Sequence, residues 1–296
     1  MGYQLFSDMT ADVSEALMRG MPEVAYVPMQ VELGGESLTY GPGGSLTVEQ
    51  FYAEQRAGKF ASTSQINPMI YRRCFEQALK AGEDVLYLCF SSGMSGTLQS
   101  ANLCAEELRE EYPARRLIVL ENTGFLKNAT PELAEYLKNM PETTYMIFVE
   151  SELDKLAAWV EENRLKICHW FTVDSFDHLK HGGRISAAAA AVGTMLQIKP
   201  LLHVDDEGKL RVAEKPRGRK QAIRTQIAHM KEGWTPEMGR LVVIGHGDCP
   251  EDAEQLRQAV LREFPDADIR TAYIGPIIGA HTGPGMLALI YWGANR

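Results

Sequence analysis

Three segments of the chain carry hydroxyl, imidazole and glycine groups of the kind that can hold an anion. Ser62-Thr63-Ser64-Gln65 stands shortly before a predicted helix, and Ser91–Thr97 (SSGMSGT) joins a predicted strand to a helix. The third segment, Gly275–Gly285, has four glycines, two prolines and His281 within eleven residues. Because a helix N-terminus presents free N–H groups and a positive dipole end, the two hydroxyl segments could bind an oxyanion.

Each of these segments also has a purely structural interpretation. Ser and Thr before a helix often only cap it, but two such segments on successive strand–helix units favour an anion site. His281 could donate to a carboxylate, or could be a structural histidine in a turn-rich connection. A further, basic group consists of Gly182-Gly183-Arg184 and the run Lys215–Lys220 (KPRGRK). It could bind phosphate or an acidic partner protein, or it could be a run of solvated surface charges.

Other chemistries have weaker support in the residue pattern. A serine hydrolase would use Ser95 as nucleophile and His281 as base, but the G-x-S-x-G elbow fails because Thr97 replaces the second glycine. An ATP-dependent kinase would need a phosphate-binding loop, and neither G-x-x-x-x-G-K-[ST] nor G-x-G-x-x-G after a strand occurs. No H-E-x-x-H is present, and His178 and His181 flank Lys180 on an expected exposed helix end, so no metal site is predicted.

The composition argues against several classes of protein. The 296 residues, 45% of them hydrophobic, can bury a sizeable core and suit two domains. A net charge of −9 argues against a nucleic-acid partner, and no segment approaches the roughly 20 apolar residues of a membrane span. No signal-peptide pattern opens the sequence, and the five cysteines include no C-x-x-C. We therefore expect a cytoplasmic protein with reduced thiols.

Strand and helix patterns alternate through the first half of the chain. This alternation predicts a parallel sheet with helical crossovers, and so an α/β domain over residues 1–163. From residue 164 hairpins mix with crossovers, which predicts an α+β domain with a mixed sheet over residues 164–296. Individual elements predicted for the chain include strands at 24–31, 143–149, 200–204 and 210–214 and helices at 11–19, 48–57, 69–80, 130–140 and 187–196.

In their order along the chain, the motifs resemble the DegV family. They are Thr-Ser-Gln, Ser-Ser-Gly-x-Ser-Gly-Thr, Leu-Lys-x-Gly-Gly-Arg-Ile, Ile-Lys-Pro, Arg-Gly-Arg-Lys and Ile-Gly-x-x-Ile-Gly-x-His-Thr-Gly-Pro-Gly, and they cover nearly the whole chain. The resemblance implies two domains with one long-chain fatty acid in a tunnel between them, and no cofactor. The ligand would contact Thr63, Ser64, Ser95, Arg184 and His281.

The same resemblance implies a protein partner. Some members of the family are the fatty-acid-binding subunits of bacterial fatty acid kinase, in which a separate ATP-binding subunit phosphorylates the held carboxylate. The protein would then be a lipid carrier without catalytic residues of its own. Lys215, Arg217 and Arg219 would dock the kinase subunit.

One stretch departs from the family pattern. After the strand 117–120 the family usually has an Asp-Ser or Asp-Thr step and a Gly/Ser-containing helix, whereas this chain continues with ENTGF (121–125). The number of residues up to Leu153 still fits the family, although the residues themselves differ. Two compensating frame shifts in the coding DNA would produce this combination, and ordinary divergence is the alternative. Reading codons 121–152 in the other frames distinguishes these two hypotheses.

Overall fold

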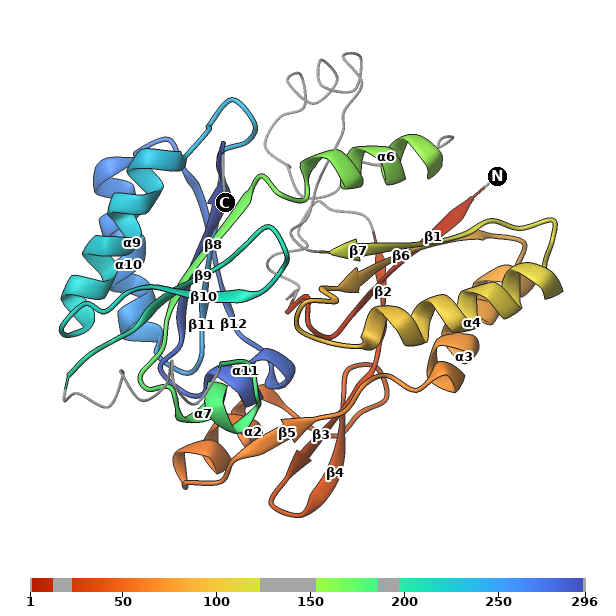
Figure 1. Cartoon of the computed structure of the whole chain (residues 1–296), viewed down its shortest axis with the longest axis horizontal. Helices are drawn as coiled ribbons and strands as arrows, with labels where there is room; N and C mark the ends of the chain where they lie inside the picture. Colours follow the sequence, from red (N-terminus) through yellow and green to blue (C-terminus); the bar gives the residue numbers. More distant parts are fainter. Residues whose placement is uncertain (1, 13–22, 123–152, 186–196, 295–296) are drawn as a thin grey trace.

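The first half of the chain builds a parallel sheet that is flanked by helices (Figure 1). The computed structural model describes residues 2–12, 23–122, 153–185 and 197–294. The strands of this sheet lie in the order β2-β1-β6-β7 and pair in parallel, as the alternation of strands and helices predicts. Their bounds are Tyr3–Asp8 for β1, Val24–Val27 for β2, Asp84–Phe90 for β6 and Leu117–Asn122 for β7.

Local signals start the helices in this half of the chain. At α2 (Val48–Arg56), Thr47 and Gln50 form the expected capping box, in which the Gln50 N–H donates to the Thr47 hydroxyl at 3.2 Å. At α3 (Pro68–Lys80), the Asn67 side chain accepts from the N–H of the second helical residue, and proline occupies the first position. Both helices therefore begin where the sequence predicts, to within one residue.

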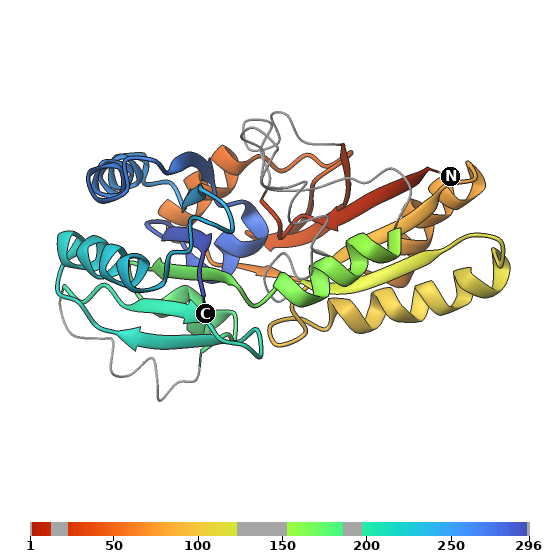
Figure 2. The same cartoon turned by 90° about the horizontal axis from the view of Figure 1, so that it is seen from above.

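Strand β6 separates two apolar cores because its side chains alternate between the faces of the sheet. Tyr87 lies in the core formed with α3 and α4 (Thr97–Glu111). Leu86 lies in the core on the opposite face, together with Trp159 of α6 (Leu153–Asn163). Figure 1 shows α3 and α4 on one side of the sheet and α6 on the other, and in Figure 2, seen from above, the green helix α6 crosses in front of the strands.

A small antiparallel sheet, in the order β4-β3-β5, lies next to the parallel one. Its strands are β3 (Met29–Leu33), β4 (Glu36–Tyr40) and β5 (Ala61–Thr63). The predicted single strand 24–31 is wrong, because Pro28 has no N–H to donate and the chain changes sheets there. The sequence also did not predict β5, whose three residues are too few for a periodic pattern.

The second half of the chain forms a mixed sheet in the order β10-β9-β8-β13-β11-β12. Strands β11 and β12 are parallel and the other pairings are antiparallel, which confirms the predicted mixed sheet and the predicted hairpin β9–β10. The strands are Ile167–Thr172 (β8), Leu201–Val204 (β9), Leu210–Glu214 (β10), Leu241–His246 (β11), Asp268–Tyr273 (β12) and Leu287–Trp292 (β13). The helices are Asp177–His181 (α7), Arg219–Gly233 (α9), Pro250–Glu263 (α10) and Pro276–Thr282 (α11).

The glycine-rich segment, for which a turn-rich connection is one of the two interpretations, contains a short and mostly buried helix, α11. Pro276 takes its first position, and Ile277 and Ala280 belong to the core of the first half of the chain. Gly279 is required by close packing, because a Cβ there would lie 2.7 Å from the Phe51 ring. The glycine content is compatible with a turn-rich connection, but here Gly279 allows the helix to approach α2 closely.

Some predictions fall outside the residues that the structure describes. These are the helices 130–140 and 187–196, the strand 143–149, most of the helix 11–19, and nearly all of the stretch 121–152 for which frame shifts are one explanation. The division into domains at residue 163 remains a prediction. Among the described residues, no helix is both long and apolar enough to cross a membrane.

Candidate functional site

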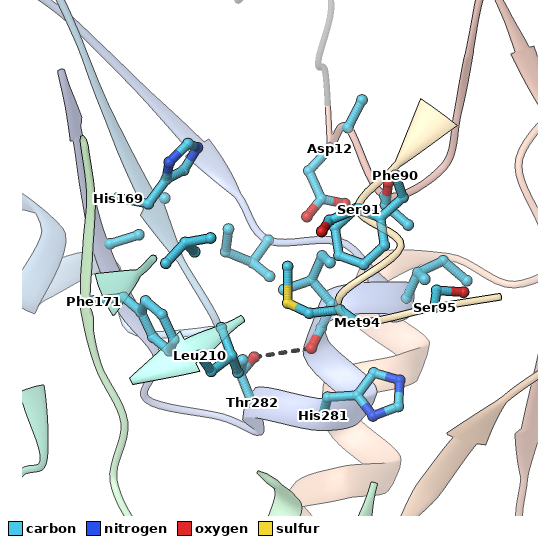
Figure 3. A pocket seen from close by; sticks show the side chains of 18 of the residues that line it. Asp12, Phe90, Ser91, Met94, Ser95, His169, Phe171, Leu210, His281 and Thr282 are labelled. Atoms are coloured by element: carbon cyan, nitrogen blue, oxygen red, sulfur yellow. Dashed lines mark hydrogen bonds between the residues drawn. The ribbon is translucent and has the colours of Figure 1, made fainter. Parts of the chain in front are cut away.

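A cavity of about 880 Å³ lies between the parallel sheet and the six-stranded sheet. Strands β1, β2 and β6 contribute to one wall, and strands β8, β11 and β13 contribute to the other. Figure 3 shows His169 and Phe171 on one side of it and Phe90 and Ser91 on the other. Its volume falls in the range of roughly 300–1,000 Å³ that is usual for small-molecule sites. Apolar side chains that line it include Leu88, Met94, Val243, Ile274 and Ile290.

A hydrogen bond between Thr63 and His281 marks the polar part of the cavity. Thr63 ends the short strand β5, His281 lies in the last turn of α11, and the Oγ1 to Nε2 distance is 2.9 Å. Gly182 allows this arrangement, because a Cβ at that position would overlap the Nδ1 side of the His281 ring. Gly182 is thus needed for close approach to the imidazole, whereas Gly183 adopts a left-handed backbone conformation with φ of 69°.

His281 is a neutral imidazole at physiological pH. Burial, together with the nearby charges of Arg184 and His181, lowers its pKa from 6.5 to about 4. Arg184 lines the same cavity, is half-buried and donates to the Gly182 carbonyl. Burial also lowers the pKa of Arg184, but an arginine remains charged. The electrostatic potential in this part of the cavity is therefore positive, which favours the binding of an anionic group.

Ser95 lies in the loop between β6 and α4, directly before the helix. Its Oγ is 2.7 Å from Thr97 Oγ1 and accepts from the Thr97 N–H at 3.3 Å. The next residue, Gly96, approaches the Gln65 side chain so closely that a Cβ would overlap it. The two hydroxyl segments of the sequence are therefore neighbours in space.

The five residues predicted as ligand contacts line one and the same cavity, although they come from four separate parts of the chain. They are Thr63, Ser64, Ser95, Arg184 and His281. Whether they contact a ligand remains a prediction.

Comparison with known proteins identifies the family. The DegV family model, described as an uncharacterised protein of that family, matches residues 3–293. The chain belongs to the DegV family. A DegV domain-containing protein from Clostridium perfringens is 35% identical over 294 residues, which cover 99% of this chain and 98% of that protein. The resemblance drawn from the motif order is thus confirmed.

Solved structures of DegV proteins share the fold of this chain. The structure described as fatty acid binding of a DegV family protein from Thermus thermophilus has a TM-score of 0.76 at 27% identity, covering 99% of this chain and 100% of that one. The Streptococcus pneumoniae fatty acid kinase B3 protein, loaded with linoleic acid, has a TM-score of 0.77 at 19% identity, covering 99% of each chain. At that identity the second likeness concerns the fold alone.

The basic run of this DegV chain does not form one exposed patch. Lys215 and Arg217 are exposed, as a docking role would need. Arg219 is not, since its guanidinium pairs with Asp174 at 2.7 Å and Asp252 at 2.9 Å and its side chain is only 14% exposed. The expectation that Arg219 is an exposed docking cation is therefore corrected: it ties α9 to α10 and to the residues after β8.

The geometry gives the serine hydrolase interpretation no support. The Ser95 hydroxyl pairs with Thr97, and the Nε2 atom of His281 pairs with Thr63. In the part of the chain that the structure describes, no acidic side chain pairs with His281, whose Nδ1 has no hydrogen-bond partner. The described residues also contain no cluster of three or more metal-ligating side chains.

Several polar residues of the cavity wall were not found from the sequence, among them His169, Tyr26 and Asp12. His169 lies in β8, Tyr26 in β2, and Asp12 shortly after β1. Only Asp12 had a signal in the sequence, and it was weak. An acidic residue that follows the first strand of a parallel sheet lies at the edge where such sheets bind ligands.

Proposed function

We propose that this DegV protein binds one long-chain fatty acid in the cavity and holds its carboxylate at Thr63, Ser95 and His281. The observation that carries the proposal is a largely apolar cavity between two sheets with the Thr63–His281 hydrogen bond in its polar part. The Thermus thermophilus relative, which is described as fatty acid binding, supports the class of ligand.

The acyl chain would supply most of the affinity. Burying the 14 or so methylenes of a sixteen-carbon acid is worth roughly 11 kcal/mol before the costs of binding are subtracted, at about 0.8 kcal/mol each. A hydrogen bond to the carboxylate adds about 1–3 kcal/mol before desolvation. The hydroxyls of Thr63 and Ser95 would therefore mainly orient the carboxylate.

The charge balance of the site suits a carboxylate. His281 is neutral, so it can offer a hydrogen bond without bringing a second full charge into the cavity. Arg184 supplies the compensating positive charge from a half-buried position. A buried carboxylate needs such partners because leaving it unpaired in an apolar surrounding is costly.

We further propose that the held carboxylate is presented to a separate ATP-dependent kinase subunit, which forms the acyl phosphate. The proposal assigns ATP binding to the partner, since the sequence has no phosphate-loop motif. The exposed Lys215 and Arg217 are the candidates for docking. Such rim charges would act mainly on the association rate and its salt dependence.

Mass spectrometry of lipid extracted from the purified protein tests the binding step. We expect fatty acid at about one equivalent, and renewed uptake of palmitate or oleate after the lipid has been removed. A protein that purifies without fatty acid and takes up neither acid would contradict the proposed function. The kinase step is tested separately, by adding ATP and a candidate kinase subunit to the loaded protein and assaying acyl phosphate.

A further inference from the structure

A fully buried carboxylate lies at the end of the first strand of the parallel sheet. Asp8 is the last residue of β1 and is 0% exposed. Its side chain points into the core that Tyr87 shares with α3 and α4, since the Tyr87 hydroxyl donates to it. Taking a carboxylate out of water is costly unless hydrogen bonds replace its hydration. The hydrogen bonds of Asp8 therefore indicate what this residue does.

Four hydrogen bonds end on the two carboxylate oxygens of Asp8. Oδ1 accepts from the Thr10 N–H at 3.0 Å and from the Thr10 hydroxyl. Oδ2 accepts from the Tyr87 hydroxyl at 2.7 Å and from the Phe90 N–H at 3.3 Å. Because the single hydroxyl proton of Tyr87 points to Asp8, Tyr71 is the donor in the 3.0 Å bond between the two tyrosines. A buried chain of two hydroxyls thus orients the oxygen that holds Phe90.

The bond to Phe90 lies at the point where β6 separates from β1. The pairing of these two strands ends with Ser7 opposite Leu88. The Asp8 carbonyl accepts from the Ala11 N–H, in the turn that follows β1. The Asp8 side chain therefore provides the Phe90 N–H with an acceptor beyond the last paired residues of the two strands. It fixes the place at which the chain leaves the sheet.

Phe90 is followed directly by the turn that carries Ser95. The carbonyl of Ser91 accepts from the Met94 N–H at 3.1 Å and from the Ser95 N–H at 3.0 Å. Phe90, Ser91 and Ser95 all line the cavity and lie on the same side of it in Figure 3. A displacement of Phe90 would therefore also displace the Ser95 hydroxyl, because a closed turn connects them.

We infer that Asp8 is a positioning residue for Ser95 and thereby sets the preference of the cavity for a carboxylate end group. The inference rests on the proposed fatty acid binding and adds the residue that holds one of the carboxylate contacts in place. Asp8 acts through Phe90 and Ser91 and does not touch the ligand. Hydrogen bonds to a charged group are stronger than those to a neutral one. A displaced Ser95 should therefore weaken binding of an acid more than binding of an alcohol with the same chain.

Titration of the lipid-free protein with palmitate and with 1-hexadecanol measures this preference as the ratio of the two dissociation constants. Asp8→Asn keeps the shape of the side chain, but an amide can accept at only one of the two oxygen positions. We expect it to reduce the preference for palmitate by about threefold to tenfold. Ser95→Ala should reduce it to a similar extent. The double variant should lose no more than the larger single loss, because groups that act through one another are not additive.

Two tyrosine variants make the test independent of whether Asp8→Asn folds. Tyr87→Phe keeps the ring but removes the hydroxyl that orients Asp8 Oδ2, and it should reduce the preference by about twofold to threefold. Tyr71→Phe is the matched control, since it removes the hydroxyl one step further from Asp8 in the same buried chain. It should lower the melting temperature and leave the preference unchanged.

The outcomes separate this inference from the proposed function. If the ratio stays unchanged in folded Asp8→Asn and Tyr87→Phe, through no loss or through equal losses for both ligands, Asp8 only stabilises the fold and the inference is refuted. Losses that add up in the double variant with Ser95→Ala, or a wild-type protein without a preference for palmitate, refute it as well, while fatty acid binding stands. If the wild-type protein does not bind palmitate, the proposed function fails, and the inference fails with it.

Discussion

The Thr63 hydroxyl and the His281 imidazole lie 2.9 Å apart, although 218 positions separate them in the sequence. The bond connects the end of β5 to the last turn of α11, and both side chains line the cavity. Its two partners thus hold each other in place at the position where the proposed carboxylate would bind.

Removing the Thr63 hydroxyl should affect orientation of the ligand more than its affinity. Thr63→Val keeps the shape of the side chain but cannot bond to His281 or to a carboxylate. We expect palmitate affinity to fall by no more than about tenfold, since acyl burial provides most of the binding free energy. Phosphorylation by a kinase subunit should fall further, and Ser95→Ala should act in the same direction.

The measurement compares the palmitate dissociation constant with the rate of acyl-phosphate formation. Thr225→Val serves as the control, because the Thr225 hydroxyl donates to the Gln221 carbonyl within α9, outside the cavity. Equal losses of binding and of phosphorylation in Thr63→Val would contradict this division of roles.

Adding a methyl group at Gly182 should displace the His281 ring. The Cβ of Gly182→Ala would overlap Nδ1 of that ring, so the imidazole or the loop must move. We expect weaker palmitate binding, by roughly tenfold, together with a lower melting temperature. Gly233→Ala is the matched control, since its nearest heavy atom would be 3.8 Å away, and it should leave binding unchanged. Unaltered binding in Gly182→Ala would show that the position of His281 is not critical.

The neutral His281 should make stability depend on pH in a defined window. Its pKa is lowered by burial to about 4, whereas in the unfolded chain it is near 6.5. Between these values the unfolded state binds the extra proton, so the free energy of unfolding should fall as pH drops from about 6.5 to about 4. Above about pH 6.5 His281 is neutral in both the folded and the unfolded state, so the free energy of unfolding loses nothing to its protonation.

Denaturant unfolding of the lipid-free protein at several pH values measures this effect. His281→Gln should show a smaller loss of stability across the window, and the difference between the two proteins is the relevant quantity. The comparison is needed because burial also lowers the pKa of His178 and His246. Parallel pH profiles for wild type and variant would refute the prediction.

Charge reversal should separate the exposed cations from Arg219. Arg219→Glu places a carboxylate beside Asp174 and Asp252, and we expect the free energy of unfolding to fall by about 3 kcal/mol, as when a poorly exposed ion pair loses one partner. Lys215→Glu with Arg217→Glu alters exposed groups and should change stability by less than about 0.5 kcal/mol.

Only the second, exposed pair of substitutions is suited to test docking. The Lys215→Glu and Arg217→Glu double variant should slow acyl-phosphate formation with a kinase subunit, most at low salt, while its fatty acid content stays the same. An unchanged rate would show that the partner docks elsewhere. Loss of fatty acid from a folded double variant would assign these residues to the ligand site.

The sequence alone was enough to predict the elements whose signals are local. The Thr47–Gln50 capping box and the Asn67 cap each involve groups within three residues of one another, so the pattern already contains the interaction. The alternation of strands and helices predicted the parallel sheet, and the order of the short motifs predicted the family. The same motifs also contain the residues that line the cavity near His281.

Tertiary structure decided the features that depend on partners far away in the chain. Arg219 appears in the sequence as part of a basic run, but Asp174 and Asp252 reach it from positions 45 and 33 residues away and bury it. The glycines before His281 are typical of a turn-rich connection, yet the segment is a helix, and Gly279 lets it lie directly against Phe51. Burial and long-range pairing arise only when distant segments meet, and no local pattern encodes which of them will do so.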